Sequence, residues 1–190
     1  EGDPELIQEI IKREKRRNNV DYRKEDVCIT TGVTEGLQIM LNATLDPGDE
    51  LLIPGPTYPQ YSLITKFNNA KPVPYNCIEE EWWQPDVDDI RKNITSNTKG
   101  IVIINPNNPT GSLYSNKVIK EIIDIGGENL VPVISDEIYD DMTFDEKQYS
   151  TASLTKDVPV ITLNGFSKVY LMPGWRVGYV LFHHSGELDE

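Results

Sequence analysis

The chain has 190 residues, enough to bury the core of one domain, and its formal net charge of −13 argues against a surface for nucleic acid or an anionic membrane. Its first residues show neither the basic nor the apolar segment of a signal peptide, and no stretch is apolar for long enough to span a bilayer. Cys28 and Cys77 lie far apart without a metal spacing. Free, buried thiols in a cytoplasmic protein are therefore expected, with a disulfide as the alternative.

The N-terminal residues predict an amphipathic helix. Asp3 followed by Pro4 is typical of a helix start, because aspartate caps free N–H groups and proline fits the first turn. Apolar residues then recur on one face over the next two turns. The basic run of residues 12–17 lies on the same helix and contains a glutamate, so we interpret it as a solvated face.

A strand is predicted over residues 26–30, followed by a turn at Gly32 and a second helix. A helix that starts directly after such a turn points free backbone N–H groups at one place, which is a ready site for an anion. A short strand over residues 50–54 comes next and is stopped by the prolines of residues 54–59. Tyr58 is therefore expected on a stiff loop just beyond a strand end.

The middle of the chain continues this alternation. Residues 71–75 predict a weak edge strand because they contain two prolines, and the acidic segment 77–84 predicts a surface loop. Apolar spacing indicates a helix over residues 87–94. Residues 100–104 form a continuous apolar run, typical of a strand buried on both faces, and the rigid turn that follows contains Asn108.

The last third predicts a helix from Ser115, a strand over residues 131–135 that ends at Asp136, and a strand that leads to Lys168. A final strand is predicted over residues 176–182. The connection before it has no helical period and is barely long enough for a crossover. We therefore expect the last strand to be antiparallel to its neighbour.

Strands that alternate with helices predict an α/β fold of three layers, with a mainly parallel sheet of about seven strands, the last of them antiparallel. No internal domain boundary is visible. Sheets of this kind bind ligands beyond the carboxyl ends of their strands. The candidate site residues that follow strands are Gly32, Tyr58, Asn108, Asp136 and Lys168.

Each candidate also has a plainer interpretation. Lys168 could be an exposed loop lysine, Asn108 a turn residue and Tyr58 a packing tyrosine. The acidic residues after the 131–135 strand could form a solvated loop or a divalent-metal site; they are Asp136, Glu137, Asp140, Asp141 and Asp145. A strand ending in acids also occurs in P-loop NTPases, but no G-x-x-x-x-G-K-[ST] motif is present. The pair His183-His184 is placed after the last strand and interpreted as surface.

Four motifs, in order and spacing, resemble the class I and II aminotransferases, which are fold-type-I enzymes that use pyridoxal 5′-phosphate (PLP). They are Asn-Pro-Thr-Gly at 108–111, Ser-Asp-Glu-Ile-Tyr at 135–139, Ser-Lys at 167–168 and Gly-Trp-Arg-Val-Gly-Tyr at 174–179. The resemblance covers essentially the whole chain and extends to archaeal alanine aminotransferases. It implies transfer of an amino group between an alanine-like or aspartate-like amino acid and a 2-oxo acid such as 2-oxoglutarate, by a cytoplasmic homodimer.

The resemblance also implies how the cofactor ring would be held. Lys168 would attach PLP through its amine and then move the substrate proton; burial of that amine would favour its uncharged form. Asp136 would pair with the pyridine nitrogen and keep it protonated. Tyr139 and Asn108 would donate hydrogen bonds to the phenolic oxygen of the ring, and Tyr58 would stack on its face.

The cofactor phosphate would lie at the start of the second helix. The N–H groups of Val33 and Thr34, the Thr34 hydroxyl and the guanidinium of Arg176 would hold it. Many family members also carry a serine three residues before the lysine, where this chain has Gly165. Ser167 would then replace that donor.

Residues 1–190 correspond to the PLP-binding large domain of the family, without the N-terminal arm and the C-terminal small domain. No arginine here fits the role of binding the substrate carboxylate: Arg176 is assigned to the phosphate, and the others are on predicted surface elements. The isolated chain is therefore expected to be inactive. A PLP-dependent C–S lyase or synthase of the same fold, or a catalytically silent fragment, are the alternatives.

Overall fold

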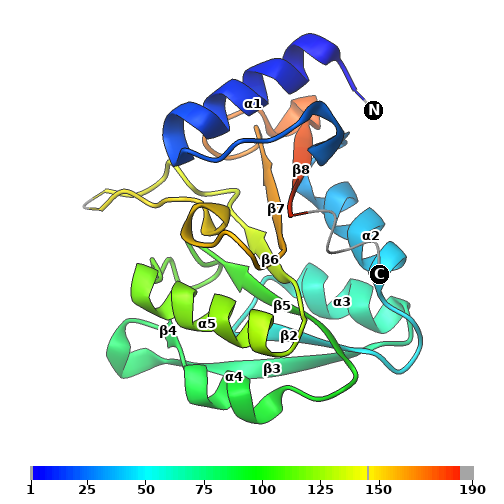
Figure 1. Ribbon diagram of the computed structural model, residues 1–190, viewed down its shortest axis with the longest axis vertical. Coiled ribbons are helices and arrows are strands. Elements are labelled where there is room, and N and C mark those ends of the chain that lie inside the picture. The colour runs from blue at the N-terminus through cyan, green and yellow to red at the C-terminus, as the bar shows by residue number, and fades with distance from the viewer. Residues whose placement is uncertain (1, 145, 185–190) are drawn as a thin grey trace.

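A computed structural model describes residues 2–144 and 146–184, and in this part of the chain eight strands form one sheet with helices on both faces (Figure 1). The strands are β1 (Val27–Thr30), β2 (Glu50–Gly55), β3 (Lys71–Ile78), β4 (Gln84–Pro85), β5 (Thr98–Ile104), β6 (Val133–Asp136), β7 (Val160–Gly165) and β8 (Gly178–His183). The α-helices are α1 (Pro4–Asn18), α2 (Val33–Thr44), α3 (Pro59–Phe67), α4 (Val87–Asn93) and α5 (Asn116–Glu128).

The strands lie in the order β1-β8-β7-β6-β5-β2-β3-β4. From β7 to β3 all neighbours are parallel, whereas β8 is antiparallel to both β7 and β1. The predicted α/β class and the antiparallel last strand are therefore confirmed. About seven strands were expected, and the described sheet has eight. The additional strand is β4, which lies in the segment interpreted as a loop and pairs with the end of β3.

The two faces of the sheet bury separate apolar clusters. Helices α1, α4 and α5 pack with one face, and α2 and α3 pack with the other (Figure 1). The predicted double burial of β5 is confirmed, since side chains alternate along a strand. Ile101 and Ile103 join the first cluster. Val102 and Ile104 join the second.

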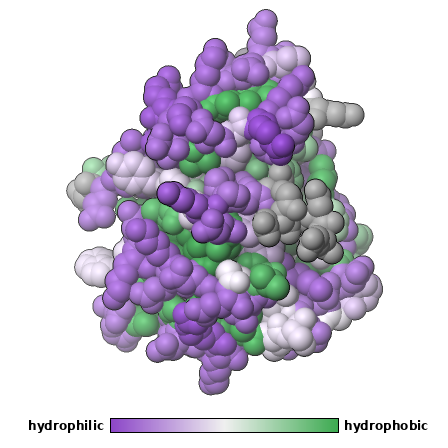
Figure 2. All heavy atoms as spheres, viewed as in Figure 1, coloured by the Kyte–Doolittle hydropathy of each residue, from purple (hydrophilic) through white to green (hydrophobic). Residues whose placement is uncertain are grey.

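Hydrophilic side chains cover most of the face of the molecule seen in Figure 2. No helix in residues 2–144 and 146–184 combines the length and the apolar composition needed to cross a membrane. Cys28 and Cys77 are free and half-buried, in agreement with the preference for thiols over a disulfide.

Helix α1 starts as predicted, because the Asp3 carboxylate accepts hydrogen bonds from the N–H groups of Glu5 and Leu6 at 2.8 and 3.3 Å. The interpretation of residues 12–17 as a solvated face is wrong for two of the arginines. The side chains of Arg13 and Arg17 are only 12% and 14% exposed. They face the segment after β6, whose acidic residues neutralise them, so packing of α1 removes them from water.

Two other expectations need correction. Strand β3 is longer than predicted, because it continues beyond residue 75 to Ile78 and pairs there with β4. Its first part, which contains the two prolines, pairs with β2 on one side only, as expected for an edge strand. His183 lies within β8 and is half-buried, with its ring centroid 6.1 Å from that of Tyr22. Burial lowers the pKa of His183, which keeps the imidazole neutral. His184 is exposed as expected.

Candidate active site

The carboxyl ends of the parallel strands meet at one edge of the sheet. Ile104 of β5 pairs with Asp136 of β6, and Asp136 pairs with Leu163 of β7. A cavity of about 220 Å³ lies at this edge. Its lining includes the nine residues that were predicted to contact the cofactor, from five separate parts of the sequence: Val33, Thr34, Tyr58, Asn108, Asp136, Tyr139, Ser167, Lys168 and Arg176. Gly32, the other candidate, is not part of this lining.

Asp136 is the buried carboxylate of this cavity, with 4% exposure. Its Oδ2 accepts a hydrogen bond from the Tyr61 hydroxyl at 2.9 Å, and its Oδ1 accepts from the N–H of Ile138 at 3.2 Å. Burial raises the pKa of Asp136 to about 6, although these two hydrogen bonds and the charge of Lys168 act in the opposite direction. The carboxylate is thus ionised at neutral pH and available to a cationic partner.

Tyr61 is a residue that the sequence analysis did not single out. It lies in the first turn of α3, three residues after Tyr58, and its side chain is completely buried. Its hydroxyl donates to Asp136 and so helps to orient the carboxylate. A second tyrosine one helical turn beyond a candidate site tyrosine was the available signal, because such residues share a helix face.

Removal of the Tyr61 hydroxyl should make Asp136 easier to protonate. In Tyr61→Phe the carboxylate loses a donor that favours its charged form, so the pKa of Asp136 should rise above about 6. A shift of about one unit is expected from one hydrogen bond to a charged group. NMR titration of the Asp136 carboxyl carbon checks this, with Tyr58→Phe as the matched control; an unchanged midpoint would contradict the assignment.

Lys168 and Tyr139 face each other across the cavity. The Lys168 Nζ lies 5.7 Å from the centroid of the Tyr139 ring. Tyr139 is half-buried, whereas Lys168 is exposed. The expected burial of the lysine amine is therefore not observed in the described part of the chain.

The start of α2 and Arg176 meet although they lie far apart in sequence. The Nη2 of Arg176 donates to the carbonyl oxygen of Thr31 at 3.3 Å, and its Nη1 donates to the carbonyl oxygen of Pro173 at 2.9 Å. Gly32 caps α2 with a φ of 83°, and a Cβ at this position would lie 2.5 Å from Nη2 of Arg176. Glycine permits both this backbone conformation and the close approach. A guanidinium beside free helix N–H groups is suited to a phosphate.

A side chain at residue 165 would be crowded in this structure. A Cβ at Gly165 would lie 3.0 Å from both the Gly178 Cα and the Val177 carbonyl oxygen, so a side chain would require the backbone of the neighbouring strand to shift. Ser167 lines the same cavity and is half-buried. It is therefore the hydroxyl that this chain offers close to Lys168.

Asn108 is held by a rigid turn. The preceding residue, Asn107, donates through Nδ2 to the Tyr114 hydroxyl at 2.8 Å and accepts from the Thr110 hydroxyl at 2.9 Å. Asn107 is buried whereas Asn108 is half-buried and lines the cavity. The side chains that stabilise the turn are thus those of Asn107 and Thr110. The Asn108 side chain lines the cavity and can contact a ligand. Tyr58 is half-buried at the residue before α3.

Among the described acidic residues after β6, Glu137 and Asp140 are buried whereas Asp141 is exposed, so the solvated-loop interpretation is wrong for Glu137 and Asp140. Glu137 and Asp140 are both 1% exposed, and no cluster of metal-ligating side chains occurs among the residues that the structure describes. Asp145 lies outside the described residues. The Oε1 of Glu137 accepts from the Ser135 and Ser150 hydroxyls at 2.9 and 3.1 Å and from the N–H of Thr151 at 2.9 Å.

Glu137 should make the fold less stable as pH rises. Burial raises its pKa from 4.5 to about 8 despite these three hydrogen bonds, so the folded chain holds one more proton than the unfolded chain between those values. The contribution is fully present below pH ~4.5 and is lost as pH rises through ~8, on the order of 3–5 kcal/mol in total. Urea unfolding at several pH values should show this slope flattened in Glu137→Gln but retained in Glu80→Gln, an exposed control. An equal slope in both variants would contradict it.

Comparison with known proteins identifies the family. The profile of the family described as aminotransferase class I and II matches residues 1–187. The chain belongs to this family.

Several curated aminotransferases are similar to this chain. The glutamate-pyruvate aminotransferase AlaA of Escherichia coli is 41% identical over 92% of the chain and 43% of its own length. The alanine aminotransferase of Mycobacterium tuberculosis is 41% identical over 82% of the chain and 37% of its own length. A probable aspartate aminotransferase of Methanocaldococcus jannaschii is 37% identical over 100% of the chain and 49% of its own length.

Solved aminotransferase structures share the fold. An alanine aminotransferase from Pyrococcus furiosus superposes with a TM-score of 0.96 at 57% identity, over 99% of this chain and 49% of that one. An aspartate aminotransferase from Thermus thermophilus superposes with a TM-score of 0.91 at 31% identity, over 95% and 47%. The chain thus spans about half the length of the aminotransferases that it matches.

Proposed function

We propose that this chain is the PLP-binding large domain of an aminotransferase that moves an amino group between an alanine-like or aspartate-like amino acid and a 2-oxo acid such as 2-oxoglutarate. The observation that carries the proposal is the convergence of nine expected cofactor contacts on one cavity beyond the carboxyl ends of the strands. The named activities of the relatives support the choice of substrates.

The donor set of the cavity fits PLP. A buried carboxylate with a pKa of about 6 suits a protonated pyridine nitrogen, and the start of α2 beside Arg176 suits a phosphate. Lys168 supplies an amine to the same cavity. When bound, PLP would accept electrons from the substrate carbon that loses a proton.

Each residue of the cavity would then have a separate role. Lys168 would attach the cofactor and, once released, carry the proton from the substrate carbon. Asp136 would hold the charge of the ring nitrogen. Tyr139 and Asn108 would donate to the phenolic oxygen of the ring, and Tyr58 would contact the ring face.

The phosphate would be held at the other end of the cavity. The N–H groups of Val33 and Thr34 start α2, and the Thr34 hydroxyl lies beside them. Arg176 would add a charged donor pair, and Ser167 a hydroxyl.

We further propose that segments outside this chain complete the substrate site. Five of the six arginines have other contacts: Arg13 and Arg17 contact acids after β6, Arg23 pairs with Asp26, Arg91 pairs with Glu128, and Arg176 lies beside α2. The sixth, Arg16, is exposed on α1 and does not line the cavity. None of these is placed to bind a substrate carboxylate. The half-length match to the relatives supports the same inference.

We also propose that the intact protein is a cytoplasmic homodimer. Leu171 and Trp175, on the loop after Lys168, are 83% and 73% exposed. Exposed large apolar side chains beside a site are typical of a subunit interface. Sedimentation of the intact protein would test the dimer, and cell fractionation the location.

The decisive assay uses the intact protein that carries this sequence. With PLP and 2-oxoglutarate, alanine or aspartate should yield glutamate and the matching 2-oxo acid. Release of ammonia or thiol without any need for a 2-oxo acid would instead favour a C–S lyase and overturn the proposal. Residues 1–190 alone should show little turnover, and full activity of this part would overturn the need for further segments.

A further inference from the structure

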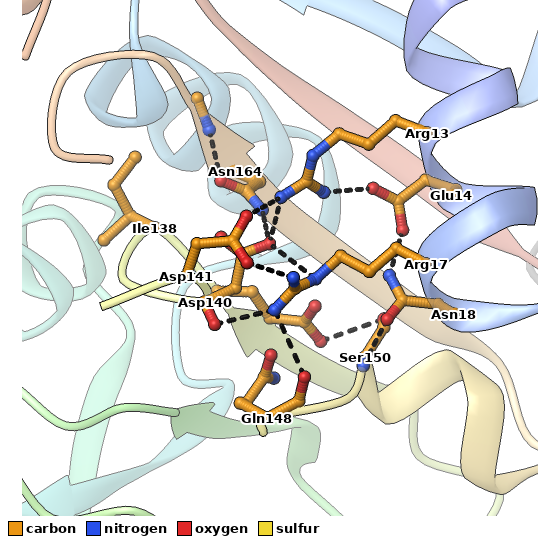
Figure 3. Close-up of polar contacts among 12 residues, drawn as sticks. Arg13, Glu14, Arg17, Asn18, Ile138, Asp140, Asp141, Gln148, Ser150 and Asn164 are labelled. Atoms are coloured by element: carbon orange, nitrogen blue, oxygen red, sulfur yellow. Dashed lines mark hydrogen bonds and ion pairs between the residues drawn. The ribbon is translucent and has the colours of Figure 1, made fainter. Parts of the chain in front are cut away.

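Two arginines on one face of α1 enter a buried polar cluster beneath the helix (Figure 3). Arg13 and Arg17 are four residues apart, so both side chains leave the helix on the same side. Both reach the turn that follows Tyr139, more than 120 positions further along the chain. The cluster therefore ties the N-terminal helix to a segment that lines the candidate active site.

Asp140 is at the centre of this cluster, and its side chain is 2% exposed. Its Oδ2 accepts a hydrogen bond from Nη2 of Arg13 at 2.6 Å and lies 3.7 Å from Nε of Arg17. Nη2 of Arg17 also donates to the main-chain carbonyl oxygen of Asp140 at 2.8 Å. Two guanidinium groups thus compensate a carboxylate that would be costly to bury alone.

The same carboxylate oxygen contacts the strand that leads to Lys168. Nδ2 of Asn164, near the end of β7, donates to Oδ2 of Asp140 at 2.9 Å (Figure 3). Oδ1 of Asn164 accepts from the N–H of Gly165 at 2.7 Å, which fixes the orientation of the amide. Asp140 therefore connects α1 and β7 through one oxygen atom.

Tyr139 immediately precedes Asp140 and points to the other side, into the cavity. Its ring is the group that lies 5.7 Å from Nζ of Lys168. Any displacement of the turn would change the distance between these two side chains. Functional groups need support from surrounding contacts, because displacements of about 0.5–1 Å already reduce their effect.

We propose that Asp140 is a positioning residue, which fixes the turn of Tyr139 to the end of β7 and so sets Tyr139 against Lys168. This inference rests on the proposed function, in which both side chains contact PLP. Arg13 and Arg17 supply the charge that keeps the Asp140 carboxylate in place.

Asp141 provides a matched control. It contacts the same two arginines, with its Oδ2 3.2 Å from Nη2 of Arg13 and its Oδ1 bound to Nη1 of Arg17. Its side chain is 37% exposed, and no hydrogen bond to β7 is present in the described structure. Asp140→Ala and Asp141→Ala each remove one carboxylate from the cluster, but only the first removes the acceptor of the hydrogen bond from Asn164 and so cuts the link to β7.

The test compares these two variants with wild type in the intact protein loaded with PLP. Tyr139 donates to the phenolic oxygen in the proposed site, so its displacement should raise the pH midpoint of the absorbance change of the bound cofactor. For Asp140→Ala we expect a rise of about one unit, the size of one hydrogen bond to a charged group, and about tenfold weaker PLP binding. Asp141→Ala should keep the wild-type midpoint and affinity.

A wild-type midpoint and PLP affinity in Asp140→Ala would overturn the inference, even if the variant were less stable, because the cluster would then be structural only. If Asp140→Ala does not fold, Asn164→Ala decides by the same readout, since it cuts the link to β7 and leaves both arginine contacts of Asp140 intact. Failure of the wild-type protein to bind PLP is a separate result, which would overturn the proposed function and this inference with it.

Discussion

Replacing Lys168 by alanine is expected to abolish covalent attachment of PLP and to reduce turnover by at least about 10²–10⁴-fold, the contribution of one positioned acid–base group. The physical reason is that Lys168 is the amine of the cavity, 5.7 Å from the ring of Tyr139 and close enough to Asp136 to affect its pKa. No other lysine lines this cavity in the described part of the chain.

The measurement is mass spectrometry of the PLP-loaded intact protein after borohydride reduction, together with turnover. Wild type should gain the mass of one reduced cofactor on the peptide that contains Lys168, and Lys168→Ala should gain none. Lys156→Ala, at an exposed lysine outside this cavity, should behave as wild type. Because Lys168 is exposed, its loss should change the unfolding free energy by no more than about 0.5 kcal/mol. Labelling of Lys168→Ala at another residue would refute the assignment.

Replacing Asp136 by asparagine should reduce turnover by about 10²–10³-fold, the range observed when one preorganised electrostatic contact is removed. Asparagine keeps the shape of the side chain and an oxygen for the Tyr61 hydroxyl, but it cannot balance a cationic ring nitrogen. PLP affinity should fall as well. The effect should exceed that of Tyr61→Phe, which leaves the carboxylate in place.

A pH titration separates the charge of Asp136 from its shape. The pKa of Asp136 is raised to about 6 by burial, so the carboxylate takes up a proton as pH falls through that value. PLP affinity of the wild-type protein should therefore decrease below pH ~6, and binding of the ring cation should move this midpoint lower. Asp136→Asn has no such proton to gain. If the PLP affinity of Asp136→Asn still decreased below pH ~6 as in wild type, a group other than Asp136 would be responsible for the pH dependence.

Much of the fold could be predicted from local patterns. The apolar run of β5 required burial on both faces, and the sheet supplies it through two separate clusters. The short connection before β8 predicted its antiparallel direction correctly. Strand β4 was missed because two residues are too few to produce a periodic signal.

The environment of individual side chains was harder to predict from the sequence. A basic run on a helix is usually solvated, but Arg13 and Arg17 are buried because acids from a distant segment neutralise them. Tyr61 was missed because its partner, Asp136, is 75 residues away. The expected burial of Lys168 was wrong for the chain as described, since that loop is exposed here.

The sequence by itself determined which residue types follow each strand, and hence that an amine, a carboxylate, an amide and a guanidinium gather at the carboxyl edge of a parallel sheet. This was possible because side-chain alternation is local, and because strands that alternate with helices along the chain are typical of a parallel sheet. Only the tertiary structure decided which charges are buried and paired, as in the contacts of Asp140 with Arg13 and Asn164. Such contacts depend on how α1 packs against the ends of the strands, and no local pattern encodes the distance between two segments that meet only in the folded chain.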